Sequence, residues 1–114
     1  EGNMEQIELE QFTGTENYYK HWLGFNYTDG VKYLAEKAKA YWLLDAIGSY
    51  QPKFKSIPFQ VWELVVKNSE GVLTMKEDTD SPILVSQKIP YTDFPLDNVK
   101  VWLIDGVAIL PSEY

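Results

Sequence analysis

A chain of 114 residues, 45% hydrophobic and 24% charged, is long enough for one folded core and too short for two. It contains no cysteine, which excludes disulfides, thiolate nucleophiles and zinc sites built on sulfur. The formal net charge is −7, and the ten basic residues are all lysines. Because the arginine forks that read phosphate and guanine are missing, we do not expect the protein to bind nucleic acid.

No stretch of the sequence approaches the ~20 apolar residues that a membrane span requires, and no basic leader followed by an apolar run opens it. We therefore expect a cytoplasmic protein with no membrane partner. Residues 1–3 precede Met4 and are interpreted as an expression remnant or a trimmed leader. Residues 4–114 are then expected to form a single α+β domain.

Two short helical segments are predicted in the first 24 residues. Residues 1–16 hold five glutamates and no lysine, and are interpreted as a short helix or a loosely docked arm. Thr13 followed by Glu16 fits a capping box, which would start the second segment. That helix would run to about Leu23, with Gly24 as its stop.

The longest predicted helix spans residues 31–50, after an N-cap at Thr28 or Asp29. Asp45 lies inside its apolar face, where an unpaired carboxylate would be unfavourable, so we expect Asp45 to be largely buried and hydrogen-bonded. Its candidate partners are a tyrosine hydroxyl, an indole N–H, a backbone amide of residues 25–28, or His21. The apolar face recurs at helical spacing and consists of Val31, Leu34, Ala35, Ala38, Tyr41, Trp42 and Ala46.

After Pro58 the hydrophobic period changes to two, which predicts strands. The strand at residues 59–67 is apolar on both faces and is expected to be central in a sheet. Further strands are predicted at residues 72–77, 83–89, 99–104 and 107–110, and the Asp105-Gly106 pair between two apolar runs predicts a hairpin. The expected fold class is α+β, with N-terminal helices packed on a four- to five-stranded antiparallel meander sheet.

Four segments of the chain are distinctive as strings. They are FTGTENYYKH at residues 12–21, YTDGVKYLA through YWLLD at residues 27–45, FQVW at residues 59–62, and YTDFPL through LPSEY at residues 91–114. Together they resemble a family of small bacterial and mobile-element proteins that is known as a domain of unknown function. The resemblance covers nearly the whole chain from Phe12 onward and implies one full-length domain, without an activity, a cofactor or a partner.

The candidate catalytic residues are His21, Asp45 and Glu63. His21 and Asp45 could form an imidazole–carboxylate pair for acid–base chemistry; alternatively, His21 complements the negative end of a helix and Asp45 makes a structural hydrogen bond. Glu63 interrupts the apolar strand, either as a buried carboxylate or because one face of the strand is only half covered. The chain has no glycine-rich phosphate loop and one histidine, so we expect neither a cofactor nor a bound metal.

Aromatic residues are abundant, and five of them are candidate ligand or interface residues: Tyr18, Tyr19, Trp22, Tyr27 and Trp42. Large rigid rings give contact area with little loss of entropy, so such a group can form a stacking wall or a binding hot spot. The alternative is that the rings are the core of a small domain. Partial exposure would favour the binding surface.

The leading functional hypothesis is a non-catalytic interaction or regulatory module, because aromatic residues and acidic charge occur without a recognisable catalytic set. We expect a homo-oligomer, since the end of the long helix and the strand at residues 59–67 are apolar on more than one side; an unidentified protein is the other expected partner. One alternative is a small enzyme or small-ligand binder that uses His21 and Asp45 in a helix–sheet cleft. Another is an acidic decoy that mimics nucleic acid.

Overall fold

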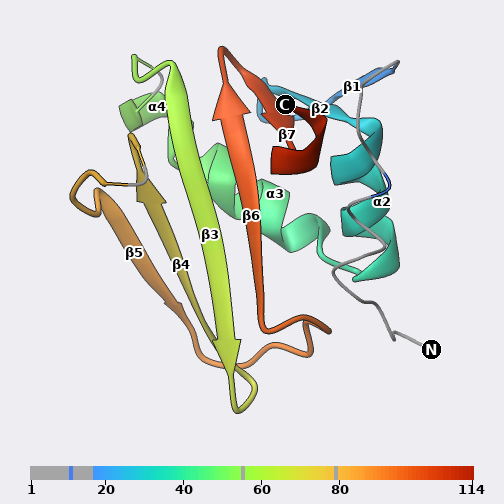
Figure 1. Ribbon diagram of the computed structural model, residues 1–114, viewed down its shortest axis with the longest axis vertical. Coiled ribbons are helices and arrows are strands. Elements are labelled where there is room, and N and C mark those ends of the chain that lie inside the picture. The colour runs from blue at the N-terminus through green and yellow to red at the C-terminus, as the bar shows by residue number, and fades with distance from the viewer. Residues whose placement is uncertain (1–10, 12–16, 55, 79) are drawn as a thin grey trace.

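Strands of the described chain form one mixed seven-stranded sheet in the order β1-β2-β7-β6-β3-β4-β5 (Figure 1). The computed structural model describes residues 11, 17–54, 56–78 and 80–114. Neighbouring strands pair antiparallel, except that β2 and β7 are parallel. The expected four- to five-stranded antiparallel meander with N-terminal helices is therefore wrong. The strands are β1 (Tyr18–Lys20), β2 (Asn26–Thr28), β3 (Phe59–Lys67), β4 (Glu70–Lys76), β5 (Val85–Ile89), β6 (Asn98–Ile104) and β7 (Val107–Ile109).

Strands β1 and β2 form a hairpin where the sequence predicts a helix ending near residue 23. The turn is closed by His21 N–H, which donates to Phe25 O at 2.7 Å, and by Gly24 N–H, which donates to His21 O at 3.0 Å. Gly24 has a φ of 105°, the left-handed backbone that ends a three-residue hairpin loop. The aromatic residues on either side of this turn favour strands over helix. The glycine therefore completes a β-turn and does not stop a helix.

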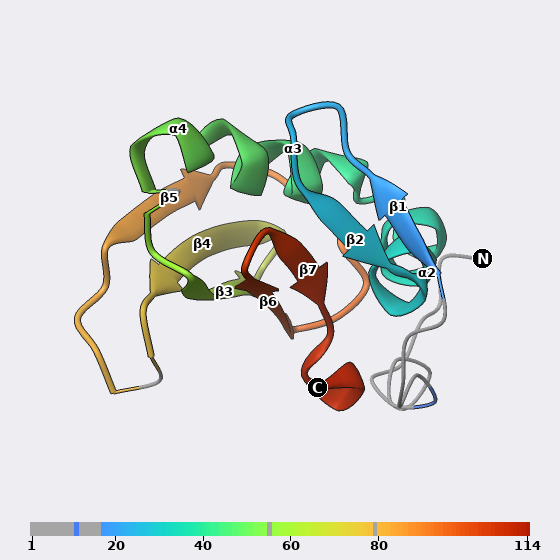
Figure 2. The same cartoon turned by 90° about the horizontal axis from the view of Figure 1, so that it is seen from above.

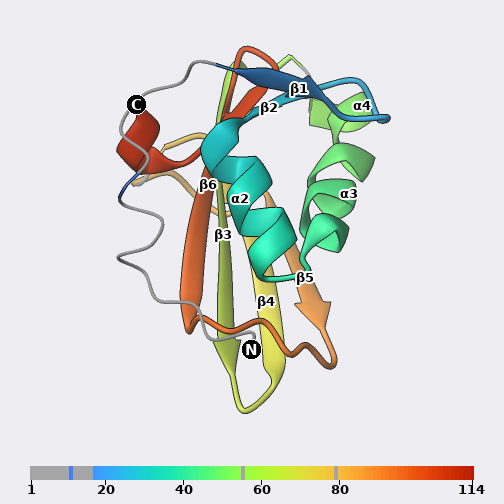
Figure 3. The same cartoon turned by 90° about the vertical axis from the view of Figure 1, so that its right-hand side faces the viewer.

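The hairpin joins the sheet through the parallel pair of β2 and β7. Asn26 is paired with Val107 and Tyr27 with Ala108. Asn26 N–H also donates to Gly106 O at 2.9 Å. The N-terminal hairpin is thus held by the C-terminal strand, and it lies above α2 and α3 in Figure 3.

The predicted helix at residues 31–50 is broken after residue 37. Lys39 has a φ of 53°, and Ala40 N–H donates to Ala35 O at 2.8 Å, which is the bond pattern of a Schellman cap. Because glycine normally takes this left-handed position, Lys39 gives no sequence signal for the break. The helices are α2 (Asp29–Lys37), α3 (Tyr41–Ser49) and α4 (Gln51–Phe54).

The start of α2 agrees with the sequence prediction. Thr28 is the N-cap, and its Oγ1 accepts a hydrogen bond from Val31 N–H at 3.4 Å. This satisfies one of the amide donors that a helix start leaves open. The predicted capping box at Thr13 and Glu16 lies outside the described residues.

The strands after residue 58 agree closely with the predicted ones. The bounds of β3 are the predicted bounds, and the other strands begin and end within two residues of prediction. Asp105 and Gly106 have φ values of 50° and 83° and form the predicted tight turn. Asn68 and Ser69 form a second turn of this type between β3 and β4, with φ values of 54° and 65°.

Helices α2, α3 and α4 lie on one face of the sheet, which we call the core face (Figure 2). Trp62 and Leu64 of β3 are buried there against Leu44 and Ile47 of α3 in one hydrophobic cluster. On the other side, which we call the open face, lies the C-terminal 3-10 helix η1 (Pro111–Glu113) (Figure 2). In the described part of the chain, no helix is long and apolar enough to cross a membrane.

Candidate functional site

The turn of the β1–β2 hairpin brings His21, Trp22 and Asp45 together. His21 Nε2 lies 2.8 Å from Asp45 Oδ1, and Trp22 Nε1 donates to the same oxygen at 3.0 Å. His21 is buried, and its ring stacks on the buried ring of Phe25 with 4.5 Å between centroids. The structure thus pairs the two sequence-predicted catalytic candidates and adds Trp22 to them.

Both ring nitrogens of His21 are engaged within the hairpin. The backbone N–H of Leu23 donates to Nδ1 at 3.1 Å, so Nδ1 is an acceptor and Nε2 carries the proton that is donated to Asp45. A general base needs a nitrogen within reach of a substrate proton. In this arrangement His21 would have to give up a turn-closing bond first, so its geometry is that of a structural residue.

Asp45 is half-exposed, with 49% of its side chain accessible, so the prediction of a largely buried carboxylate is wrong. The break at Lys39 is the reason. The predicted apolar face was projected along one continuous helix, whereas α3 begins a new helix with its own direction. The prediction that Asp45 is hydrogen-bonded is confirmed, and its partners are His21 and Trp22.

The aromatic candidates divide into exposed and half-buried rings. Tyr18 is 59% exposed and Trp22 is 77% exposed, whereas Tyr19, Tyr27 and Trp42 are half-buried. The rings of Tyr19 and Tyr27 face each other across the hairpin with 5.6 Å between centroids. Trp42 packs against the hydrophobic core. The exposed rings of Tyr18, at the start of β1, and of Trp22, in the turn, favour a binding role over a core role for these two residues.

Carboxylates lie beside the tyrosines of this surface. Tyr19 Oη donates to Asp29 Oδ1 at 2.8 Å, and this hydrogen bond raises the pKa of Tyr19. Lys32 Nζ lies 4.7 Å from the centre of the Tyr19 ring, within cation–π distance. The Tyr19 ring thus already contacts Lys32 of the same chain, whereas no lysine of the described residues lies over the Trp22 ring.

Among the described residues, Tyr41 has the most strongly raised pKa. The sequence does not identify it as a candidate site residue. Burial, followed by the charges of Tyr27 and Glu36, raises its pKa to about 12. Its hydroxyl donates to Glu36 Oε2 at 3.4 Å. The sequence does not predict this raised pKa, because Tyr41 begins α3 and comes close to Tyr27 of the hairpin only when the chain is folded.

The raised pKa of Tyr41 predicts a loss of stability in alkali. The folded state holds this proton more tightly than the unfolded state, so its contribution is complete below pH 10 and is lost as the pH rises towards about 12. In urea unfolding at several alkaline pH values, the wild type should lose stability relative to Tyr41→Phe over this range. Tyr91→Phe, at an exposed tyrosine, serves as the control and should follow the wild type. Parallel curves for wild type and Tyr41→Phe would contradict the assignment.

Glu63 lies far from the hairpin, on the open face of the sheet. It is half-buried, and its Oε2 accepts a hydrogen bond from Asn98 Nδ2 at 3.3 Å. Its cross-strand neighbours are Thr74 on β4 and Lys100 on β6. The alternative of a half-covered strand face therefore describes Glu63 better than a buried carboxylate, and Glu63 does not join His21 and Asp45.

The open face carries two groups of apolar side chains, which are separated by the row of Thr74, Glu63 and Lys100. The register places Val61 beside Trp102, and Val65 beside Val72. At one end Tyr114 packs on Phe59 and Trp102, with 6.4 Å and 5.4 Å between ring centroids. Apolar residues on this face are Phe59, Val61, Val65, Val72, Trp102, Ile104, Val107 and Ile109.

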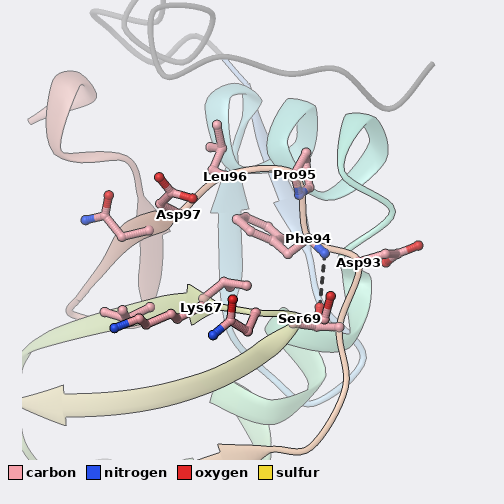
Figure 4. A pocket seen from close by; sticks show the side chains of 12 residues that line it. Lys67, Ser69, Asp93, Phe94, Pro95, Leu96 and Asp97 are labelled. Atoms are coloured by element: carbon pink, nitrogen blue, oxygen red, sulfur yellow. Dashed lines mark hydrogen bonds between the residues drawn. The ribbon is translucent and has the colours of Figure 1, made fainter.

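The linings of two hollows of the described chain do not include His21 or Asp45. One, of about 410 Å³, lies between the hairpin turn, α4 and the β6–β7 turn, where Phe25, Leu103 and Gln60 line it. The other, of about 780 Å³, is an open hollow between residues 65–69 and the loop at residues 92–98. Figure 4 shows Phe94 pointing into this second hollow and Asp93 pointing away from it. Neither described lining includes His21 or Asp45, and no three metal-ligating side chains of the described chain come together.

A family model described as a family of unknown function (DUF6876) matches residues 3–114. Neither the curated proteins nor the solved structures contain a match to the chain. The family match covers nearly the whole chain and confirms the resemblance to a domain of unknown function. The chain therefore belongs to the family of unknown function DUF6876.

Proposed function

We propose that this protein is a non-catalytic interaction module that self-associates through the open face of its sheet. The observation that carries the proposal is the second apolar side of β3, which faces away from α3 and α4 (Figure 2). Val65 and Val72 are directly opposite each other there and remain 46% and 42% exposed. Exposed apolar side chains of this kind are stabilised when a partner covers them.

The charges on the open face suit a second copy of the chain. Glu63 lies among the apolar residues, while Lys88 and Lys100 lie on the same face, on β5 and β6. A two-fold dimer presents each surface to itself, so a face must contain both signs to be self-complementary. In such a dimer a lysine of one copy can approach Glu63 of the other.

The size of the open face predicts a weak dimer. With strands about 4.8 Å apart and a rise of about 3.3 Å per residue, the five strands from β7 to β5, which have three to nine residues each, present roughly 500 Å². A standard stable interface buries about 800 Å² on each partner. We therefore propose a dimer that forms at high concentration and dissociates on dilution.

The arrangement of His21 supports a non-catalytic role over the enzyme alternative. Its Nδ1 accepts from Leu23 N–H and its Nε2 lies against Asp45, so both nitrogens serve the turn. The hollow of about 410 Å³ beside α4 is lined by residues other than His21 and Asp45. Acid–base chemistry would need a ring nitrogen and a substrate cleft at the same place.

Substitution of Val65 by glutamate tests the proposed dimer. In sedimentation equilibrium, the average mass of the wild type should rise from that of the monomer between about 10 µM and about 1 mM. Val65→Glu should remain monomeric over this range, because it replaces half of the exposed Val65–Val72 pair with a charge that the contact would have to desolvate. The residue is exposed, so the variant should keep the wild-type fold.

Ile83→Glu is the matched control for this experiment. Ile83 is also an exposed aliphatic residue, but it lies before β5 and outside the open face. This variant should associate like the wild type. A wild type that stays monomeric to the highest concentration, or equal association of both variants, would remove the proposal.

A further inference from the structure

Trp22 is exposed and yet fixed in orientation. Its Nε1 is bonded to Asp45 Oδ1 at 3.0 Å, and its ring lies against His21 at 5.9 Å between centroids and 28° between planes. His21 is itself stacked on Phe25, which is part of the buried core. One face of the indole is therefore supported by the hairpin while the rest of the ring is open to solvent. An aromatic ring held in this way loses little entropy when a partner covers it.

The carboxylate beside this ring has one oxygen left for a ligand. His21 and Trp22 both contact Oδ1 of Asp45, and no described residue donates to Oδ2. The proton on His21 Nε2 belongs to a neutral ring, since Nδ1 accepts from the Leu23 amide. Among the described residues no lysine forms an ion pair with Asp45. A negative charge and an open aromatic face thus lie side by side.

We propose that Trp22 and Asp45 form a binding site for an arginine side chain of a partner protein. A guanidinium group is planar, stacks on an indole face and donates in the plane of its fork to a carboxylate, so it can use both groups at once. An apolar anchor would cover the ring but would leave Asp45 Oδ2 without a donor as it is desolvated. The chain itself contains lysine and no arginine. The arginine must come from a different protein, and the site is separate from the open face used for self-association.

An NMR titration of the ¹⁵N-labelled chain tests this site. The probes are a blocked Gly-Arg-Gly peptide, its lysine counterpart and its citrulline counterpart, which keeps the planar shape without the charge. The arginine peptide should shift the indole N–H resonance of Trp22 in a saturable manner. Its Kd should be at least about fivefold lower than those of the other two peptides.

Asp45→Asn removes the negative charge of the site but keeps an oxygen that can accept the hydrogen bonds of the turn. Asparagine keeps the oxygen that accepts from Trp22 and lies against His21, so the resonances of residues 21–25 should stay close to wild type while the arginine peptide binds at least about fivefold more weakly. Trp22→Ala should abolish the binding. Asp93→Asn removes an exposed carboxylate from the loop of the second hollow and should leave the Kd unchanged. The proposal fails if Asp45→Asn binds the arginine peptide as tightly as wild type, or if the lysine or citrulline peptide binds equally well.

Discussion

Replacement of Glu113 by alanine should lower the free energy of unfolding by about 3 kcal/mol. The Glu113 side chain is buried at the N-terminus of α2, where it accepts hydrogen bonds from Thr28 Oγ1 at 2.6 Å and from Gly30 N–H at 3.1 Å. It also accepts from Leu110 N–H at 2.9 Å. Alanine would leave these donors buried and without their acceptor, and would remove a negative charge from the positive end of the helix.

The position of Gly30 shows how closely the C-terminal segment approaches α2. A Cβ on Gly30 would lie 2.7 Å from Glu113 Cδ, so any larger residue would displace the carboxylate. Urea unfolding of Glu113→Ala measures the expected loss, with Glu77→Ala as the control. Glu77 is exposed after β4, and its removal should change the free energy of unfolding by less than about 0.5 kcal/mol. Equal effects of the two substitutions would show that the Glu113 contacts do not stabilise the fold.

The second half of the fold could be predicted because its signals are local. Alternating apolar residues identify β3, and the Asp105-Gly106 pair fixes a turn that needs two residues with positive φ. Antiparallel neighbours joined by short turns follow directly from the order of the strands along the chain. The parallel pairing of Asn26 with Val107 has no such signal, because the two residues are distant in sequence and no turn joins them.

The sequence predicts a helix in place of the N-terminal hairpin because a glycine at position 24 is compatible with both structures. A glycine with positive φ is typical both after the last turn of a helix and at the end of a three-residue hairpin loop. The two readings differ in the residues before the glycine. Tyr18, Tyr19 and Trp22 are aromatic residues, whose strand propensity favours the hairpin over the helix.

The sequence predicts the contact of His21 with Asp45 but not the exposure of Asp45. The sequence paired His21 with Asp45 as one option, and the hairpin brings them within hydrogen-bond distance. The facing of Asp45 was wrong, because Lys39 adopts a left-handed conformation that lysine rarely takes and so breaks the helix without a glycine. Glu113 was not identified, since its role depends on contact with a helix start more than eighty residues earlier.

A substitution of Gln60 by leucine should also lower the free energy of unfolding by about 3 kcal/mol, although leucine has a similar volume and is more apolar. Gln60 is 1% exposed on β3, and its amide connects that strand to α4 and to the segment after it. Its Oε1 accepts from Gln51 Nε2 and Trp62 Nε1, each at 2.9 Å. Its Nε2 lies within 3.2 Å of Gln51 Oε1, Phe54 O and Ile57 O.

Leucine would leave the indole N–H of Trp62 and the carbonyl oxygen of Ile57 without this partner, whereas Phe54 O would keep its bond from Ile57 N–H. The desolvation of the two orphaned groups outweighs the gain from a more apolar side chain. A double-mutant cycle with Gln51→Leu separates this network from a simple change in packing. Because Gln51 and Gln60 exchange two hydrogen bonds, the double variant should be more stable than the sum of the single losses predicts, by about 1 kcal/mol or more. Additive losses in urea unfolding would mean that the two amides act independently, and a stable Gln60→Leu would mean that water satisfies the groups the amide now serves.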